Sequence, residues 1–240
     1  MTDVATLRIE GGKANAMTPE LLDTIERTVD DFERSPARAA VLTGYDKYFS
    51  AGLALPALVD LDRPAMKAFI ERFSRAMVRV FRCEKPIVAA INGHAIAGGC
   101  VLALMCDVRV IVADDTVRIG LNETQLGIGL PAIVLEPLRA QVPASSLVQL
   151  AIGGALVSPR EALALGLVHE VGGDAHAIAA RYAAVPPAAA AQVKRGLRAP
   201  VLELVERTAA RETEAWLDTW FTADAQERLH AAVAKMGARR

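Results

Sequence analysis

One carboxylate stands out because its loop is otherwise mostly apolar. Glu123 lies within residues 119–131, a segment that carries isoleucine and leucine on both sides of it. If this carboxylate is buried, desolvation raises its pKa toward the range of a general base that works near neutral pH. An exposed loop glutamate, or one that pairs with the neighbouring Asn122 and Thr124, explains the same residues. Taken alone, the segment favours these structural explanations.

Two earlier loops are rich in small residues. Residues 48–53 (YFSAGL) follow a short apolar run, and residues 93–100 (GHAIAGGC) lead into an apolar helix. Small residues let a ligand approach the backbone, so that N–H groups become usable donors. The N-terminus of a helix also favours negative charge. Taken alone, a tight turn and close helix packing explain the two loops more simply.

Other catalytic and binding motifs are missing from the sequence. Its four histidines are not at metal-ligand spacing with another histidine, a cysteine or a carboxylate, so we expect no metal site. The sequence contains no Gly-x-Ser-x-Gly elbow and no Gly-x-Gly-x-x-Gly after a strand. Serine hydrolase and dinucleotide-binding folds are therefore unsupported.

The elements that must hold these loops alternate in type, which predicts an α/β fold. Thr18 and Pro19 open a first helix, and an apolar face repeats at helical spacing over residues 64–81. Short apolar runs predict buried strands at residues 39–43, 86–91 and 108–112, with a helix over 100–105. Beyond residue 143 the signals are nearly all helical, and Ser158 with Glu161 forms a capping box.

Composition and charge narrow the class of protein. The chain has 240 residues, 52% apolar and 23% charged, with a formal net charge of −1. It is a folded protein by composition, and nothing suggests a nucleic-acid partner. The three cysteines predict buried free thiols in a reducing compartment. We see no signal peptide and no membrane span, so a cytoplasmic protein is expected.

Taken together and in order, these motifs resemble the crotonase (enoyl-CoA hydratase/isomerase) superfamily. The segments that carry the resemblance are residues 13–17 (KANAM), 41–44 (VLTG) with 49–53 (FSAGL), 91–93 (ING) with 97–100 (AGGC), 161–162 (EA) with 165–168 (LGLV), and 221–224 (FTAD). The resemblance covers nearly the whole chain. It implies a spiral of ββα turns over residues 1–185, which carries the coenzyme A site, and a helical trimerisation region over residues 186–240.

The resemblance also implies the residues of the site. The backbone N–H groups of Leu53 and Gly98 would form an oxyanion hole for the thioester oxygen, and Glu123 would transfer protons. Contacts with coenzyme A would come from Lys13, Ala14, Ser50, Ala51, Leu53 and Leu55. Coenzyme A is part of the acyl-CoA substrate, so we expect no permanently bound cofactor. The expected assembly is a homotrimer or hexamer.

One position separates the reactions of the superfamily. Hydratases use a second glutamate in the helix after the second glycine loop, and this chain has Val101 there. A lone Glu123 suits a proton shuttle from C2 to C4, which is Δ3-to-Δ2 enoyl-CoA isomerisation in fatty-acid oxidation. The segment 119–128 also resembles the mitochondrial-type isomerases, although Ala54 and Pro56 depart from that pattern. A hydratase, another crotonase chemistry, or a non-catalytic acyl-CoA-binding paralogue stay open as alternatives.

Overall fold

The computed structural model describes residues 3–237. Its α-helices are α1 (Pro19–Arg34), α2 (Leu55–Leu58), α3 (Arg63–Arg82), α4 (Gly98–Met105), α5 (Ala132–Gln141), α6 (Ala144–Leu147), α7 (Pro159–Ala164), α8 (Ala175–Ala183), α9 (Pro187–Trp220) and α10 (Ala223–Gly237). Its strands are β1 (Val4–Arg8), β2 (Ala39–Thr43), β3 (Tyr48–Ser50), β4 (Ile87–Ile91), β5 (His94–Ile96), β6 (Val108–Ile111), β7 (Ile119–Gly120) and β8 (Glu170–Val171). Three further helical turns are η1 (Lys13–Asn15), η2 (Glu123–Leu126) and the π-helical η3 (Val148–Ile152).

Two parallel sheets organise the first two-thirds of the chain. The larger sheet has the order β1-β2-β4-β6-β8, and the smaller has the order β3-β5-β7. In the larger sheet Val41 aligns with Val88, and Val88 with Val108. Its central strands are apolar on both faces because helices cover both faces of a parallel sheet.

Each turn of the chain contributes one strand to each sheet. The pairs β2 and β3, β4 and β5, and β6 and β7 run in this order, and helical segments follow each pair. This is the expected spiral of ββα turns, and the α/β prediction is confirmed.

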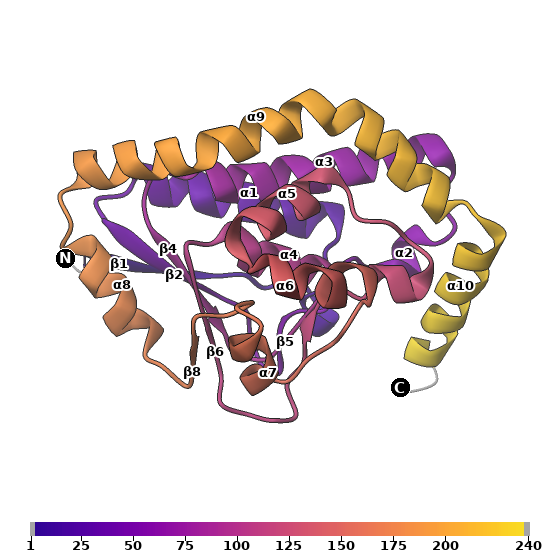
Figure 1. Cartoon of the computed structure of the whole chain (residues 1–240), viewed down its shortest axis with the longest axis horizontal. Helices are drawn as coiled ribbons and strands as arrows, with labels where there is room; N and C mark the ends of the chain where they lie inside the picture. Colours follow the sequence, from indigo (N-terminus) through magenta and orange to yellow (C-terminus); the bar gives the residue numbers. More distant parts are fainter. Residues whose placement is uncertain (1–2, 238–240) are drawn as a thin grey trace.

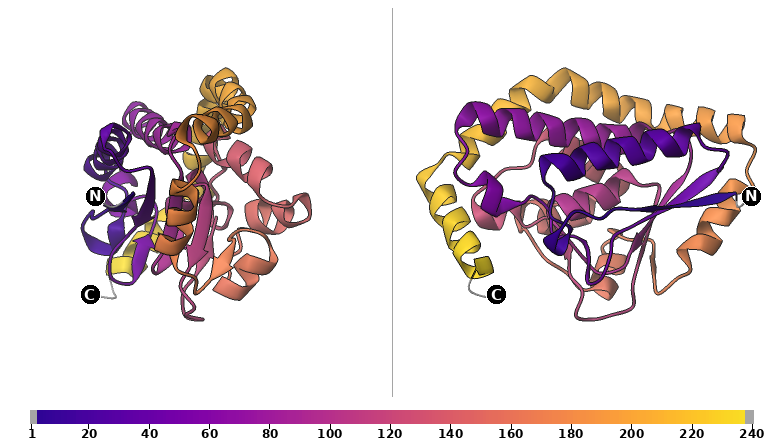
Figure 2. Two further views of the ribbon diagram at one scale, coloured as in Figure 1. Left: turned by 90° about the vertical axis from the view of Figure 1, so that its left-hand side faces the viewer. Right: turned by 180° about the vertical axis from the view of Figure 1, so that it is seen from behind.

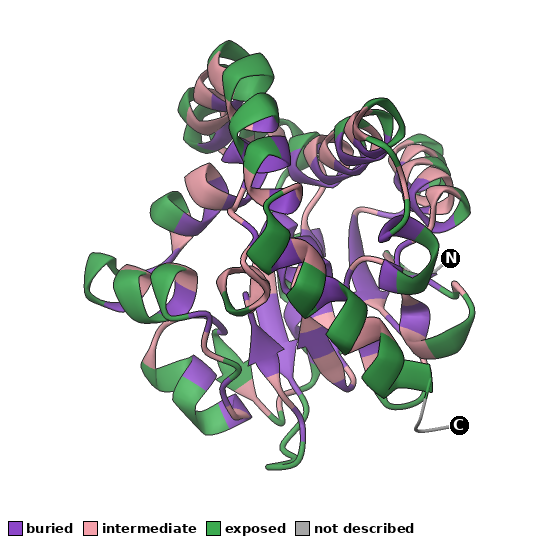
Figure 3. Cartoon of the chain, turned by 90° about the vertical axis from the view of Figure 1, so that its right-hand side faces the viewer, coloured by how far each residue is buried: buried purple, intermediate pink, exposed green. Residues whose placement is uncertain are grey.

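Helices enclose the larger sheet from two sides. Figure 1 shows α9 running along the upper edge of the molecule above α1 and α3, and the view from behind in Figure 2 shows the same order. On the opposite face, Ile178 and Ala179 of α8 pack on Val41 and Val88 of the sheet. Figure 3 shows that the strands at the centre are buried, whereas α10 presents a largely exposed face.

The helix starts follow the predicted capping chemistry. The Thr18 hydroxyl accepts a hydrogen bond from the N–H of Leu21, and Ser158 and Glu161 make both bonds of the predicted capping box. The helix expected over residues 100–105 begins two residues earlier, at Gly98. In the described part of the chain, no helix is both long and apolar enough to cross a bilayer.

Candidate active site

The small sheet brings the three predicted loops together. Its strands β3, β5 and β7 are parallel, so the segments that leave their carboxyl ends start side by side. The N–H of Ala97, after β5, donates to the carbonyl of Gly120, in β7, at 2.8 Å. The second and third loops, joined here between positions 97 and 120, thus share one edge of the fold with the first.

The first and second loops meet at two glycines. A Cβ on Gly98 would lie 3.3 Å from the Cα of Gly52 and 3.1 Å from the sulfur of Met17, so only glycine fits without a shift. Gly52 has φ +82°, a conformation that L side chains rarely adopt. In the described part of the chain, the N–H groups of Leu53 and Gly98 donate to no protein acceptor. Two free backbone donors therefore stand on facing loops.

Buried polar side chains fix the first loop from behind. Asn15, fully buried with φ +52°, donates its side-chain amide to the carbonyls of Ile9 and Phe49 at 3.0 and 2.8 Å. The Ser50 hydroxyl donates to the Asn15 carbonyl and accepts from the N–H of Gly52. Ser50 is fully buried, so its hydroxyl supports the loop and does not face the solvent.

The predicted coenzyme A contacts surround this loop. Ala14 accepts a hydrogen bond from the N–H of Ala51 at 3.0 Å, which ties η1 to the loop. Lys13 is exposed at the start of η1. Leu53 is half-buried, and Leu55 opens α2 as a largely buried residue. The fold therefore gathers the predicted set into one region, and Lys13 is its exposed cation.

The second loop is held in an uncommon backbone conformation. Ala97 has φ +50° and ψ −119°, although it is not glycine. Such a conformation costs about 1–3 kcal/mol and persists only where the surroundings impose it. Here the hydrogen bond from Ala97 to Gly120 and the first turn of α4, where the Val101 N–H donates to the Ala97 carbonyl, hold it in place. Backbone strain therefore sits next to the free N–H of Gly98.

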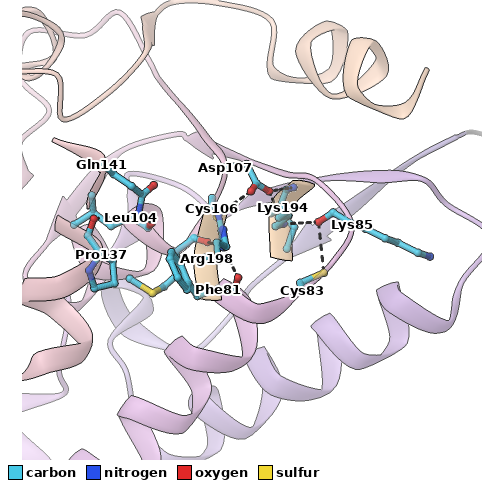
Figure 4. Close-up of polar contacts among 12 residues, drawn as sticks. Phe81, Cys83, Lys85, Leu104, Cys106, Asp107, Pro137, Gln141, Lys194 and Arg198 are labelled. Atoms are coloured by element: carbon cyan, nitrogen blue, oxygen red, sulfur yellow. Dashed lines mark hydrogen bonds and ion pairs between the residues drawn. The ribbon is translucent and has the colours of Figure 1, made fainter. Parts of the chain in front are cut away.

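The far end of α4 is anchored by polar side chains. Arg198 donates to the Met105 carbonyl at 2.9 Å, and Gln141 donates to the Leu104 carbonyl at 2.7 Å. Figure 4 shows Arg198 beside Asp107, and Gln141 beside Leu104 and Pro137. The last carbonyls of a helix lack partners within the helix, so these donors satisfy them. Contacts with α5 and α9 thereby fix the helix whose first N–H is that of Gly98.

Glu123 opens η2, and one oxygen of its carboxylate has no hydrogen-bond partner. The residue is half-buried, yet its Oε2 is sealed from solvent and has no hydrogen-bond partner in the described structure. Burial raises the pKa of Glu123 to about 7, opposed by a bond from its own backbone N–H. Burial, and next the charge of Glu123, raise the pKa of the Cys100 thiol in α4. A group with this pKa can hold or release a proton near neutral pH.

The second acidic position is absent from α4. Val101 is fully buried, and all the other residues of this apolar helix are buried as well. Its side chain can neither accept nor donate a proton. Within the described residues, no set of three or more histidine, cysteine or acidic side chains converges to hold a metal ion.

The C-terminal helices cover the third loop within the same chain. A Cβ on Gly127 would lie 3.1 Å from the Cα of Ala225 in α10, and the Gly129 N–H donates to the Thr219 hydroxyl at 2.9 Å. The helices α9 and α10 therefore pack on the loop that carries Glu123.

Comparison with known proteins identifies the family. The family description "Enoyl-CoA hydratase/isomerase" matches residues 2–237. This chain belongs to the enoyl-CoA hydratase/isomerase family. It is a crotonase-family enzyme, and this family acts on coenzyme A thioesters.

Its relatives carry both reaction names. A probable enoyl-CoA hydratase of Bacillus subtilis is 31% identical over 97% of this chain and 93% of its own length. A putative enoyl-CoA hydratase of Thermus thermophilus is 38% identical over 66% of this chain, and the match spans 63% of that relative's length. The structure of human mitochondrial Δ3-Δ2-enoyl-CoA isomerase superposes with a TM-score of 0.90 at 26% identity, over 99% of this chain and 95% of that one.

Two features of the site were not predicted from the sequence motifs. Asn15 appeared only as part of a family segment, and its two bonds across the first loop were not expected. The anchor of α4 by Arg198 and Asp107 was missed entirely, because these residues are 91 positions apart. The one local signal was the pair of cations Lys194 and Arg198, spaced one helical turn apart on α9.

Proposed function

We propose that the enzyme isomerises Δ3-enoyl-CoA to Δ2-enoyl-CoA, with Glu123 as the only acid/base. The observation that carries this proposal is a Glu123 carboxylate with one oxygen sealed from solvent and without a partner, in a chain that has Val101 at the position of a second carboxylate. Water addition needs two proton-transferring groups at one site, whereas double-bond migration needs one group that acts twice.

The reaction proceeds in two proton transfers. The Glu123 carboxylate takes the proton from C2, and the electrons of that C–H bond form a dienolate that extends over the thioester oxygen. The carboxylic acid of Glu123 then returns the proton to C4. The electrons of the C3–C4 double bond form the new C4–H bond, the C1–C2 double-bond electrons of the dienolate become the C2–C3 double bond, and the thioester carbonyl is restored.

The free N–H groups of Leu53 and Gly98 stabilise the negative charge on the thioester oxygen. Removal of one such donor from an enzyme typically costs about 3–4 kcal/mol of transition-state stabilisation. The strained Ala97 and the anchored α4 hold the Gly98 donor in place before the substrate arrives. Preorganised donors need no rearrangement as the charge develops.

Coenzyme A is bound by the segments around the first loop. Lys13 supplies a cation for the nucleotide phosphates, and Ala14, Ala51, Leu53 and Leu55 supply backbone and apolar contacts. Ser50 contributes by holding the loop through its buried hydroxyl. The half-buried and exposed positions of Lys13, Ala14, Ala51 and Leu53 support these roles.

A direct assay decides between the candidate reactions. The purified protein is given trans-3-hexenoyl-CoA and trans-2-hexenoyl-CoA, and double-bond migration and hydration are measured separately. We expect isomerisation to exceed hydration by at least about a hundredfold, on the scale of one missing acid/base group. Comparable rates would make the protein a hydratase, and binding of both substrates without turnover would make it an acyl-CoA-binding paralogue.

The Val101→Glu variant sharpens this assay. Restoring the second carboxylate is expected to raise hydration relative to isomerisation, and Val101→Gln, which has the same size without the charge, is its matched control. Equal hydration in both variants would show that the missing carboxylate does not determine the reaction.

We further propose a homotrimeric or hexameric assembly. Val148 and Ile152 of η3 are 65% and 72% exposed, and Leu163 of α7 is 44% exposed. Exposed large apolar side chains are typical of protein interfaces when they form a patch. Light scattering of the wild type and of Ile152→Glu tests this: the variant should lower the mass toward the 25.5 kDa of one chain. A monomeric wild type would contradict it.

A further inference from the structure

A cavity lies at the end of the molecule away from the proposed active site. Its volume is about 650 Å³, and its walls come from the last turns of α3, the end of α8 and the first turns of α9. In Figure 1 this is the left end, where α8 lies and α9 starts, whereas α2 and α10 lie to the right. The 20 residues of α3 separate the two ends by about 30 Å.

The cavity opens at the amino ends of the large sheet. Arg38 precedes β2, and Lys85 and Pro86 precede β4. The free N–H groups of Leu53 and Gly98, by contrast, follow the carboxyl ends of β3 and β5. An acyl-CoA at the proposed active site would therefore leave this cavity free.

Several charges in the cavity wall are neutralised by ion pairs. Those pairs are Arg79 with Glu33, Arg82 with Glu206, and Glu84 with Arg195, at 2.5–2.6 Å. Every carboxylate that lines the cavity is thus occupied by an arginine.

Two cations in the wall have no such partner. Arg38 donates one terminal N–H to the Val185 carbonyl at 2.9 Å, and its Nε is sealed from solvent without a partner. Lys85 donates to the carbonyls of Phe32 and Ser35, at 3.1 and 2.7 Å, and both of these acceptors are neutral. Within residues 3–237, no ion pair includes Arg38 or Lys85. The cavity therefore has an excess of positive charge.

The start of α9 adds to this excess. The helix is 34 residues long, its N-cap is Pro186, and no side chain caps it. The first N–H groups of a helix lack partners within the helix and favour an anion. Ala188 and Ala190 of this turn line the cavity, and their small side chains leave the backbone accessible. The remaining wall is apolar, with Val185 and the ring of Tyr182.

We propose that this cavity binds a small organic anion. Its carboxylate or phosphate head lies at Arg38 and Lys85, near the first turn of α9, and its apolar body lies against Tyr182 and Val185. A volume of about 650 Å³ is within the 300–1,000 Å³ of small-molecule sites. The site is independent of Glu123 and of the reaction proposed above.

Calorimetric titration of the full-length protein with hexanoate and with phenyl phosphate tests the proposal. Both titrations are done with the active site filled by butyryl-CoA, so that only a second site responds. We expect saturable binding of at least one of the two compounds with a stoichiometry of one per chain. The tighter of the two identifies the head group as carboxylate or phosphate.

Variants locate the binding. Arg38→Gln should weaken it by about tenfold or more, because it removes a charge-assisted hydrogen bond, while Arg38→Lys should retain most of the affinity. Arg82→Gln is the matched control: it lines the same cavity, but its charge is already paired with Glu206, so affinity should stay within about twofold. Lys85→Gln provides a second variant if Arg38→Gln does not fold.

Three results would overturn the proposal. They are the absence of saturable binding, wild-type affinity in both Arg38→Gln and Lys85→Gln, and, in a parallel titration with inorganic phosphate, binding as tight as that of phenyl phosphate with none for hexanoate. The last result would mean that the cavity holds an adventitious ion only.

Discussion

Asp107 and Glu123 are both partly buried acidic side chains, and the surroundings of their carboxylates differ. Asp107 accepts hydrogen bonds from Arg198 and from Lys194, each at 2.7 Å (Figure 4). It also accepts one from the N–H of Ile87 at 2.7 Å. Glu123 has an oxygen that is sealed from solvent and accepts no bond. The first carboxylate has its charge compensated by two cations, and the second has none.

This difference separates a structural acid from a catalytic one. The oxygens of Asp107 are occupied, and its partners join α9 to the large sheet and to the end of α4. Glu123 is destabilised in its charged form by burial, so it is available to take up a proton. Strongly perturbed, uncompensated acids concentrate at functional sites. The chain thus stabilises its fold at one carboxylate and leaves the other free to react.

The largest effect on stability is expected at the paired carboxylate. Asp107→Asn leaves Lys194 and Arg198, whose side chains are 11% and 10% exposed, without a counter-charge. Breaking a buried pair from one side costs about 3–5 kcal/mol, and urea denaturation should show this loss of unfolding free energy. Asp218→Asn is the control: its pair with Arg63 is exposed, so the change should be under about 1 kcal/mol. Equal effects of the two substitutions would refute the proposed difference.

The charged carboxylate of Glu123, unlike that of Asp107, should lower the stability of the folded protein. The pKa of Glu123 is about 7 in the folded protein against 4.5 for an ordinary glutamate. Between these values the folded chain holds a proton that the unfolded chain has released, so stability falls as the pH rises from about 4.5 to 7. The loss amounts to at most about 3 kcal/mol.

Glu123→Gln removes this dependence. The variant should be more stable than the wild type above pH 7, and the difference between them should shrink toward pH 5. Paired denaturation curves at pH 5 and pH 8 measure it, because all other titrating groups are common to both proteins. A difference that is the same at both pH values would show that Glu123 is not buried in its charged form.

A smaller effect on stability is expected at Gln141, which lies next to the contacts of Arg198 with the end of α4. The Gln141 side chain accepts from Arg109, a cation that is 1% exposed, and donates to the Leu104 carbonyl of α4. Gln141→Met keeps the volume and removes both bonds, which should lower the unfolding free energy by about 1–2 kcal/mol. A thermal or urea melt measures it, and an unchanged midpoint would mean that this polar anchor of α4 contributes nothing.

The sequence motifs indicated the loops of the candidate site, but they did not indicate the contacts that hold these loops. The glycine loops and the helix caps at Thr18 and Ser158 depend on residues that are neighbours in the sequence, so they could be predicted from local motifs. The burial of Glu123 and the bonds of Asn15 depend on segments brought together by the sheets. The Asp107 pair with Arg198 joins positions 91 residues apart, and no local pattern identifies such a pair. The cytoplasmic location and the oligomeric state stay predictions.

The central claim is that Glu123 carries the proton transfer without help from a second acid. The direct test is Glu123→Gln, assayed for isomerisation of trans-3-hexenoyl-CoA together with binding of butyryl-CoA, with Glu227→Gln on the exposed face of α10 as the control. We predict a loss of turnover of about a thousandfold or more, with binding within a few-fold of the wild type and the control unchanged. Turnover within tenfold of the wild type would contradict the account.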